Sequence, residues 1–241
     1  MRPRLPGLAL LVLLAACGPA QPRSDEDVPS KLFPAVRRPV APIVSSRFSS
    51  EEDRDRLREA TTVMNQSGVR RGMTVADIGA GEGYYTVRLA ARVGPKGRVL
   101  AEDVVPDVRD KLAERANRER LDNVSVKLGL PADPRLPANS FDRIFLVHMY
   151  HEIEAPYEFL WRLRPALVVN GRVVVVDSNR PTSQHGTPPA LLDCEMRAVG
   201  YTLVDRHAMP SAGGYLALYA ATGPRPAPEE IRPCTPPPGS D

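Results

Sequence analysis

The residues best suited to chemistry form a glycine-rich segment at residues 75–83, which reads Val-Ala-Asp-Ile-Gly-Ala-Gly-Glu-Gly. Glycines at this spacing leave an apolar strand and enter a helix, and their missing side chains let a ligand contact the backbone. Tyr84 replaces the third small residue of the dinucleotide fingerprint, and the Lys-Ser or Lys-Thr pair of a phosphate-binding loop does not follow. The segment therefore predicts a different ligand site, with candidate binding residues Asp77, Gly79, Gly81 and Gly83.

A second acid, Asp103, follows the last of these glycines by twenty residues. It ends the next predicted strand, where a carboxylate can accept hydrogen bonds from both hydroxyls of a ribose. Its neighbour Glu102 is the weaker candidate, because successive side chains of a strand point to opposite faces. The two motifs together predict a pocket at the carboxyl ends of the strands, where ligands bind in open α/β sheets.

Two histidines follow an apolar run at residues 141–147 and are the candidate catalytic residues. His148 and His151 are the nearest possible general bases, because imidazole titrates near neutral pH. A structural alternative stays open for each: His148 satisfied by a backbone carbonyl, and His151 with Glu152 capping a helix or bracing a loop. The order His-x-x-His-Glu differs from that of zinc proteases, so no metal site is predicted.

Alternating strands and helices must position these residues. Hydrophobic periodicity predicts strands at residues 73–78, 98–103, 124–128, 141–147, 172–177, 201–206 and 215–220, and helices at 50–65, 84–93, 107–120, 156–167 and 189–199. The short loop between the last two strands predicts an antiparallel hairpin. The expected fold class is α/β, a doubly wound, seven-stranded, mostly parallel sheet with that C-terminal hairpin.

Length and composition agree with one such domain. The chain has 241 residues, of which 42% are hydrophobic and 25% charged, and this excludes collagen, a coiled coil and a wholly disordered chain. A net charge of +3 without a long basic run gives no argument for a nucleic-acid partner. The 26 prolines gather at the two ends. We therefore expect a Pro-rich tether at 17–45, a folded domain at 46–222 and a Pro-rich disordered tail at 223–241.

The first residues resemble a secretory signal. Arginines at positions 2 and 4 precede an apolar run at residues 8–16, which is shorter than the roughly 20 residues that span a bilayer. The run ends in Leu-Ala-Ala-Cys, which resembles a bacterial lipobox. This pattern predicts a lipoprotein signal peptide at 1–16, a lipid anchor on Cys17 and an exported, membrane-anchored protein that faces the periplasm. An ordinary cleaved signal that contains a cysteine is the alternative.

Two further cysteines, Cys194 and Cys234, lie in the folded block and the tail. Export would allow them to form a disulfide that joins the tail to the domain. Two separate thiols are the favoured expectation, because the sequence does not give the distance between them. Neither has the spacing of a zinc site.

From about residue 47 to residue 221 the chain resembles the class I S-adenosylmethionine-dependent methyltransferases. Four stretches beyond the glycine segment carry this resemblance in the order and spacing of the family: residues 97–106, 137–142, 170–177 and 198–201. Residues 147–153, Val-His-Met-Tyr-His-Glu-Ile, resemble a subgroup that acts on small molecules.

The resemblance implies a Rossmann-like fold, S-adenosyl-L-methionine as cofactor and a small-molecule or lipid-like methyl acceptor. It assigns the glycines to the cofactor's amino-acid part, Asp77 to that loop or to the ammonium group, and Asp103 to the ribose. The family usually binds the adenine amine with an Asp where this chain has Leu130. Asp133 is one possible substitute, and backbone and apolar contacts are the other.

The resemblance leaves two functions open. An enzyme that transfers a methyl group is the first, because the glycine loop and Asp103 are intact. The alternative is a non-catalytic lipoprotein of the same fold that serves as a binding or scaffold module, because Leu130 departs from the family and the predicted address lies outside the cytoplasm. The acceptor itself is not identified, because substrate choice in this fold depends on variable segments. We expect the helix at 50–65 and the loop at 179–189 to form a lid over the pocket. Of Tyr84 and Tyr85, one is expected in the core and the other over the cofactor.

Overall fold

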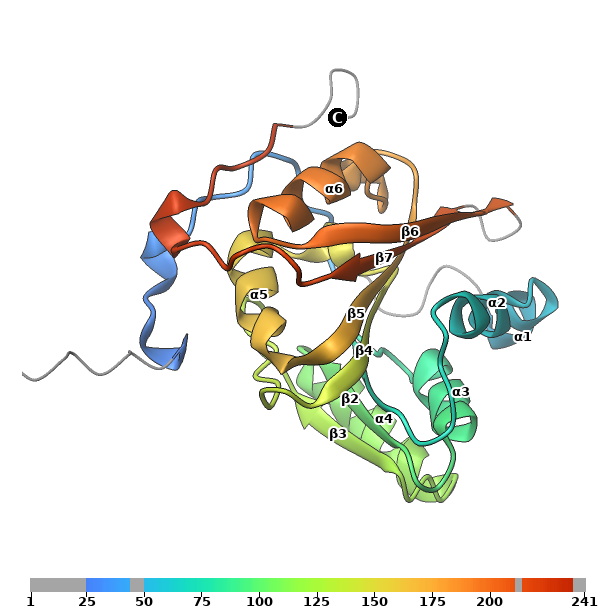
Figure 1. Cartoon of the computed structure of the whole chain (residues 1–241). Helices are drawn as coiled ribbons and strands as arrows, with labels where there is room; N and C mark the ends of the chain where they lie inside the picture. Colours follow the sequence, from blue (N-terminus) through green and yellow to red (C-terminus); the bar gives the residue numbers. More distant parts are fainter. Residues whose placement is uncertain (1–24, 44–49, 211–213, 236–241) are drawn as a thin grey trace, which may run out of the picture.

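A computed structural model of the chain describes residues 25–43, 50–210 and 214–235. Its centre is a seven-stranded sheet with the order β3-β2-β1-β4-β5-β7-β6 (Figure 1). The strands are β1 (Thr74–Ile78), β2 (Arg98–Asp103), β3 (Val124–Leu128), β4 (Phe141–Val147), β5 (Leu167–Ser178), β6 (Thr202–Met209) and β7 (Gly214–Ala220). β1 to β5 pair in parallel with one another, and β7 is antiparallel to both β5 and β6. The predicted doubly wound sheet with a terminal hairpin is confirmed.

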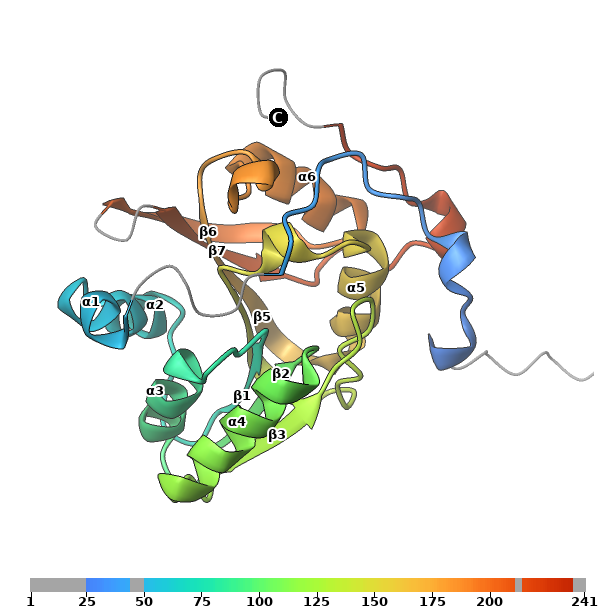
Figure 2. The same ribbon diagram turned by 180° about the vertical axis from the view of Figure 1, so that it is seen from behind.

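Helices cover both faces of the sheet, as Figures 1 and 2 show from opposite sides. They are α1 (Glu51–Arg56), α2 (Glu59–Gln66), α3 (Tyr84–Val93), α4 (Pro106–Arg118), α5 (Pro156–Leu163) and α6 (Pro189–Ala198). Apolar residues of α2 and α3 pack on one face of β1 and β2, and those of α5 and α6 pack on the opposite face of β4 and β5. Ile144 and Phe145 of β4 are fully buried on opposite faces, which explains why that strand is almost wholly apolar.

Two predicted helices differ from the observed ones. The helix expected at 50–65 is broken into α1 and α2 at Arg58, which has a left-handed φ of 55°. The break lets Arg54 of α1 bind Glu59 of α2, with 2.7 Å between Arg54 Nη2 and Glu59 Oε1. The helix expected at 156–167 ends at Leu163, and a short 3₁₀ turn that contains Pro165 leads directly into β5, because proline lacks the N–H that a continuing helix needs.

The described parts of both predicted extensions pack on the domain. Residues 25–35 and 223–232 lie side by side in both views (Figures 1 and 2), and Arg225 Nη1 binds Asp25 at 2.8 Å. The indole N–H of Trp161 donates to the Pro226 carbonyl at 2.9 Å, and Ile231 is buried. Residues 223–235 are therefore folded, and the disordered tail that we expected at 223–241 is wrong for this part. Their apolar side chains pack against α5.

A disulfide joins Cys194 of α6 to Cys234. The favoured expectation of two separate thiols is wrong, because the tail folds back over α5 and brings the two residues together. The backbone N–H of Cys234 donates to the buried hydroxyl of Tyr157 at 2.7 Å. The described part of the tail is thus held covalently and by hydrogen bonds.

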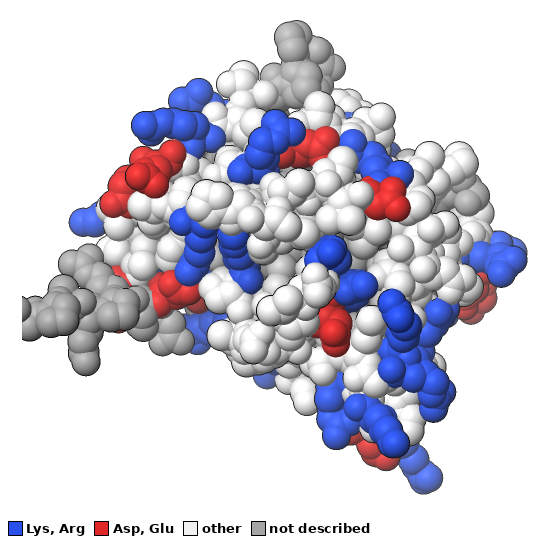
Figure 3. All heavy atoms as spheres, viewed as in Figure 1, with Lys and Arg blue, Asp and Glu red and all other residues white. Residues whose placement is uncertain are grey.

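The predicted signal peptide and Cys17 lie outside the described residues. Among the helices that the structure describes, none has the length and apolar character needed to cross a bilayer. On the face drawn in Figure 3, Lys and Arg side chains gather on the side of α3, and Asp and Glu side chains lie among the basic ones elsewhere.

Candidate functional site

A cavity of about 390 Å³ opens at the carboxyl ends of β1, β2 and β4, where the strand order reverses. This size falls within the roughly 300–1,000 Å³ of small-molecule pockets, and its position is the one expected for ligands of doubly wound sheets. Its lining includes residues 78–82, 102–105 and 152–154, together with Ile43, Ser50, Glu51, Arg54, Tyr84, Pro131, Met149 and Phe159.

The glycine loop forms one end of this cavity. Its three glycines all have a positive φ, at 66°, 56° and 91°, which disfavours a side chain at these positions: Gly79, Gly81 and Gly83. A β-carbon would also be crowded at two of these positions. A β-carbon on Gly79 would lie 3.0 Å from the Met149 side chain, and one on Gly83 would lie 2.5 Å from the Leu112 side chain. The space beside Gly81 is open. The loop can thus present its backbone to a ligand, as predicted.

Asp103 lies beside this loop and lines the cavity. Its Oδ2 accepts a hydrogen bond from the N–H of Gly81 at 3.0 Å, and its Oδ1 accepts one from Val105 at 2.9 Å. These contacts fix the carboxylate, and each oxygen keeps a further lone pair for a ligand hydroxyl.

Asp77 joins the end of β1 to α3 and does not face the cavity. It is 2% exposed, lies outside the cavity lining and accepts a hydrogen bond from the Thr86 hydroxyl at 2.6 Å. Burial raises the pKa of Asp77 to about 6, although the Thr86 hydrogen bond and the charge of Arg54 oppose this. Of the two roles predicted for Asp77, the structure favours holding the loop to α3 over contact with a ligand.

In the turn after β3, Pro131 lines the cavity, and the predicted residues Leu130 and Asp133 do not. Leu130 is 39% exposed and does not line the cavity, where its neighbour Pro131 takes part. Asp133 accepts a hydrogen bond from the N–H of Arg135 at 2.8 Å and lies outside the lining. Neither side chain is placed to contact a ligand in the cavity.

Glu102 lines the cavity instead, although its place on the strand made it the weaker candidate. Its side chain is completely buried against Gly129, and neither carboxyl oxygen accepts a hydrogen bond from any part of the chain that the structure describes. Burial, supported by the charges of Asp103 and Asp133, raises the pKa of Glu102 to about 8, while Lys127 opposes this. A buried carboxyl without a partner in the chain costs free energy, and protonation, which the raised pKa favours, reduces that cost.

Helix α1 covers the loop end of the cavity. Arg54 lies 3.9 Å from the ring centre of Tyr84, and the Tyr84 hydroxyl donates to Asp55 at 2.9 Å. Glu51 accepts hydrogen bonds from Arg88 of α3 and Arg115 of α4, so ion pairs hold the helix over the site. This part of the predicted lid lines the cavity, whereas none of the described residues of the loop at 179–189 does.

Both tyrosines of α3 belong to the buried core. Tyr85 donates to Glu59 at 3.0 Å, and Tyr84 also lines the cavity. His148 also contacts Glu59, with 3.4 Å between its Nε2 and Glu59 Oε1. Burial would raise the pKa of Glu59, but His148 and Arg54 outweigh it and lower the pKa to about 2. The predicted catalytic residue His148 therefore supports α2 and does not line the cavity.

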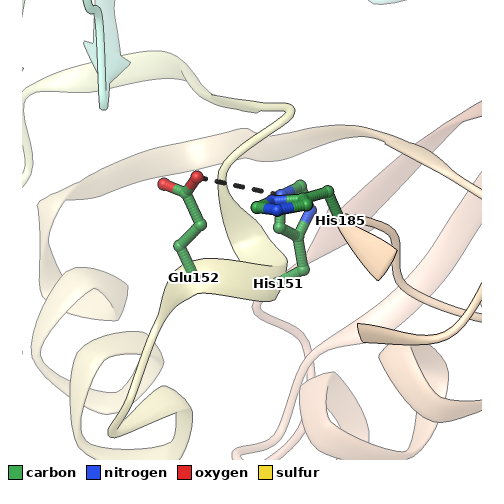
Figure 4. A group of neighbouring side chains, drawn as sticks. All are labelled: His151, Glu152 and His185. Atoms are coloured by element: carbon green, nitrogen blue, oxygen red, sulfur yellow. Dashed lines mark ion pairs between the residues drawn. The ribbon is translucent and has the colours of Figure 1, made fainter. Parts of the chain in front are cut away.

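His151 belongs to a second cluster, at the other end of the cavity. Its Nδ1 lies 3.1 Å from both carboxylate oxygens of Asp177, and its Nε2 lies 4.0 Å from Glu152 Oε1. Figure 4 shows the His151 and His185 rings crossing beside the Glu152 carboxylate; the ring centres are 5.4 Å apart. Burial, His151 and Arg180 lower the pKa of His185. Glu152 lines the cavity, whereas the predicted catalytic residue His151 is 3% exposed and does not.

Three residues at or beside the site carry no prediction from the sequence: Glu59, Asp177 and His185. Asp177 ends a strongly apolar strand, a signal that could have identified it, as for Asp103. Strand alternation makes Glu102 the weaker candidate, but both Glu102 and Asp103 line the cavity. His185 carries no local signal, since it follows His151 by 34 residues in an irregular loop.

Comparisons with known proteins agree with this geometry. Residues 75–179 match the family described as "Methyltransferase domain". Nocamycin O-methyltransferase of Saccharothrix syringae is 47% identical over 74 residues, which cover 30% of this chain and 26% of that protein. The ubiquinone/menaquinone biosynthesis C-methyltransferase UbiE of Hahella chejuensis is 27% identical over 125 residues, which cover 50% of this chain and 49% of UbiE. The chain thus spans about half or less of the length of these relatives.

Among solved structures, a SAM-dependent methyltransferase from Aquifex aeolicus has the same fold. The TM-score is 0.62 at 24% identity, over 72% of this chain and 98% of that one. The matched residues 75–179 contain the glycine loop, Asp103 and the turn that carries His151. Both ends of the cavity therefore lie mainly within the matched segment.

Proposed function

We propose that this chain is a class I methyltransferase that transfers a methyl group from S-adenosylmethionine to a small-molecule acceptor. The methyltransferase-domain match and the fold support this family, and they imply S-adenosylmethionine as the cofactor. One observation carries the proposal: a glycine loop, a carboxylate at the end of β2 and a buried carboxyl without a partner all line one cavity.

The residues present fit an adenosyl group. The open space beside Gly81 admits a ligand against the backbone, and Asp103 retains lone pairs for two ribose hydroxyls. Glu102 fits the base: with a pKa of about 8 it is mostly protonated at neutral pH, so it can donate one hydrogen bond and accept another. Adenine offers the matching pair, an acceptor ring nitrogen next to an amine donor. We propose that Glu102 replaces the acid that the family carries at the position of Leu130.

When bound, the cofactor supplies an electrophilic methyl group on a sulfonium. The protein's main contribution is positioning, because displacement requires the acceptor atom and the methyl group to be held in line. Met149, Ile153 and Phe159 give the acceptor end an apolar wall, and Glu152 and Glu154 add acids. This lining suits a small acceptor with an apolar body and a polar or cationic group.

A base is required only when the acceptor is protonated. His151 is the better placed of the two predicted histidines, because Asp177 fixes its orientation and it lies next to the cavity-lining Glu152. Since a carboxylate can only accept a hydrogen bond, Nδ1 carries the proton and Nε2 of the neutral ring keeps its lone pair. We propose His151 at the acceptor end and a supporting role for His148 beneath α2.

We also propose that the protein is an exported lipoprotein anchored through Cys17. The sequence of residues 1–17 supports this, and so does the Cys194–Cys234 disulfide, because disulfides persist mainly in oxidising compartments. Replacement of Cys17 by Ser is expected to release the protein from membranes in cell fractionation. An unchanged membrane fraction would contradict the lipid anchor.

Calorimetric titration of the full chain with S-adenosylmethionine and S-adenosylhomocysteine tests the central part of the proposal. We expect one site per chain, weakened by about 1.5–3 kcal/mol in Asp103→Ala because hydrogen bonds to a charged group are lost. Asp107→Ala, at an exposed position that begins α4, serves as the matched control and is expected to bind normally. No binding of either ligand to folded protein would refute the cofactor assignment. Binding without methyl transfer to any acceptor from a cell extract would favour the non-catalytic binding module.

A further inference from the structure

We propose that His151, Glu152 and His185 bind a divalent transition-metal ion of the Zn²⁺ class at the acceptor end of the cavity. Each residue offers one ligand atom, and these atoms all lie within 4.8 Å of one another. Figure 4 shows the three side chains converging from two segments, the turn after β4 and the loop before α6. The sequence predicts no metal, because the order His-x-x-His-Glu differs from that of zinc proteases; the structure directs His148 to Glu59 and brings His185 beside His151.

The surroundings of His151 match those of a metal ligand. Metal-binding histidines almost always donate their other ring N–H to a carboxylate, a backbone carbonyl or a water molecule, which fixes the tautomer and the ring orientation. Asp177 provides that carboxylate for Nδ1 of His151, and it is itself fixed by the Thr187 hydroxyl at 2.7 Å and the Ser178 N–H at 2.8 Å. The lone pair of Nε2 is therefore held on the side of Glu152 and His185.

The backbone of His185 is also unusual. It has a left-handed φ of 56°, which costs free energy for a residue other than glycine. A hydrogen bond from its N–H to the carbonyl of the buried Thr182, at 3.2 Å, holds this conformation. The strained turn is what places the ring against His151, in an edge-to-face contact at 89°.

The donor set decides which ion fits. Two imidazole nitrogens and one carboxylate oxygen are the ligands of catalytic zinc sites, whereas Mg²⁺ and Ca²⁺ prefer oxygen alone. Tetrahedral ligand atoms at about 2.0–2.1 Å from zinc lie roughly 3.4 Å apart, so ligand atoms that now lie up to 4.8 Å apart would have to close by up to about 1.4 Å when the ion binds. The carboxylates of Glu152 and Asp177 would balance the charge of the ion.

Three protein ligands leave one position of a tetrahedral ion open. Of the three proposed ligands only Glu152 lines the cavity, and we place the open position on its side. That the methyl acceptor reaches it rests on the proposed function, but binding of the ion does not. In this arrangement Nε2 of His151 holds the metal and replaces the base role proposed above, because one lone pair cannot serve both; the ion would instead orient an acceptor oxygen or nitrogen.

Zinc binding can be measured without any acceptor. The full chain with Cys17→Ser, which removes a competing thiol, is stripped with a chelator and titrated with Zn²⁺ in the absence of reductant. We expect one Zn²⁺ per chain, and with Co²⁺ we expect the visible absorption bands of a four- or five-coordinate site. His185→Gln and Glu152→Gln are expected to weaken binding by more than about 100-fold, and Asp177→Asn by about 10–100-fold.

His207→Gln is the matched control, because His207 lies on the edge strand β6 and pairs with Asp205 at 3.0 Å. It is expected to keep full zinc affinity, and circular dichroism checks that each variant is folded. Absence of zinc binding to the folded parent, or binding that survives both His185→Gln and Glu152→Gln, would overturn the proposal. Titration of the same samples with S-adenosylhomocysteine separates this outcome from failure of the proposed function, because the adenosyl site contains none of these three residues.

Discussion

At one end of the cavity the glycine loop meets Asp103, and at the other end the turn that carries His151 meets His185. The first end is built from residues close in sequence and from two neighbouring strands. The second depends on distant segments, because Arg38 lies 157 residues before its partner Glu195 and donates to the carbonyls of Tyr150, His151 and Ile153. The first end is thus encoded locally, and the second is encoded by the packing of the chain ends.

The largest effect is expected from Arg38→Met. Both partners of the Arg38–Glu195 ion pair are 1% exposed, with 3.0 Å between them, and Tyr150 also donates to Glu195. Removing Arg38 leaves a buried carboxylate without its cation, which costs about 3–5 kcal/mol of unfolding free energy. Denaturant unfolding measures this. Arg37→Met, at the exposed neighbouring position, is expected to change stability little, and equal losses in both variants would contradict the account.

The next effect concerns the disulfide. Replacing Cys194 and Cys234 by Ser opens a loop of 40 residues, which is expected to cost about 2–4 kcal/mol. Because the disulfide lies far from the glycine loop in the chain, the free energy of binding S-adenosylhomocysteine should change less than the free energy of unfolding. A variant that keeps its stability but no longer binds S-adenosylhomocysteine would contradict the claim that the cofactor end is encoded locally.

Much of the fold and the cofactor end could be predicted because the signals are local. The bounds of α3, β2, β3 and β4 match the predicted ranges, since each is a run of one periodicity between turn residues. The expected role of Asp103 needed only the strand end and its spacing from the glycines. The pairing of Cys194 with Cys234, and of His151 with Asp177 and His185, depends on tertiary packing that no local pattern contains.

The pH dependence of stability distinguishes Glu102 from an ordinary carboxylate. Its pKa is about 8 in the folded protein and 4.5 as its reference value, so the folded state binds the proton more tightly. This contribution to stability is fully present below about pH 4.5 and is lost as the pH rises through about 8, by a few kcal/mol. Unfolding of the ligand-free protein across this range measures it.

Glu102→Gln should flatten that dependence and keep the affinity for S-adenosylhomocysteine, because an amide donates and accepts like a protonated carboxyl. Glu102→Leu should also flatten it but weaken the ligand. An unchanged slope in Glu102→Gln would show that another group titrates.

The smallest effect is expected in the glycine loop itself. Gly83→Ala introduces a β-carbon 2.5 Å from Leu112 at a φ of 91°, and Gly72→Ala introduces one at a φ of 88° with nothing within 4 Å. Both should lose about 1 kcal/mol from backbone strain, and Gly83→Ala should lose about 1 kcal/mol more from crowding against the buried Leu112. Thermal unfolding of the pair isolates the crowding. Equal losses would show that Leu112 moves aside.

A crystal structure of the full chain with S-adenosylhomocysteine tests the assignment of the cofactor end most directly. We predict that the ribose hydroxyls bind Asp103 and that the hydrogen-bonding edge of the adenine meets the carboxyl of Glu102. An adenosyl group outside this cavity, or a base that leaves the Glu102 carboxyl without a partner, would contradict the account.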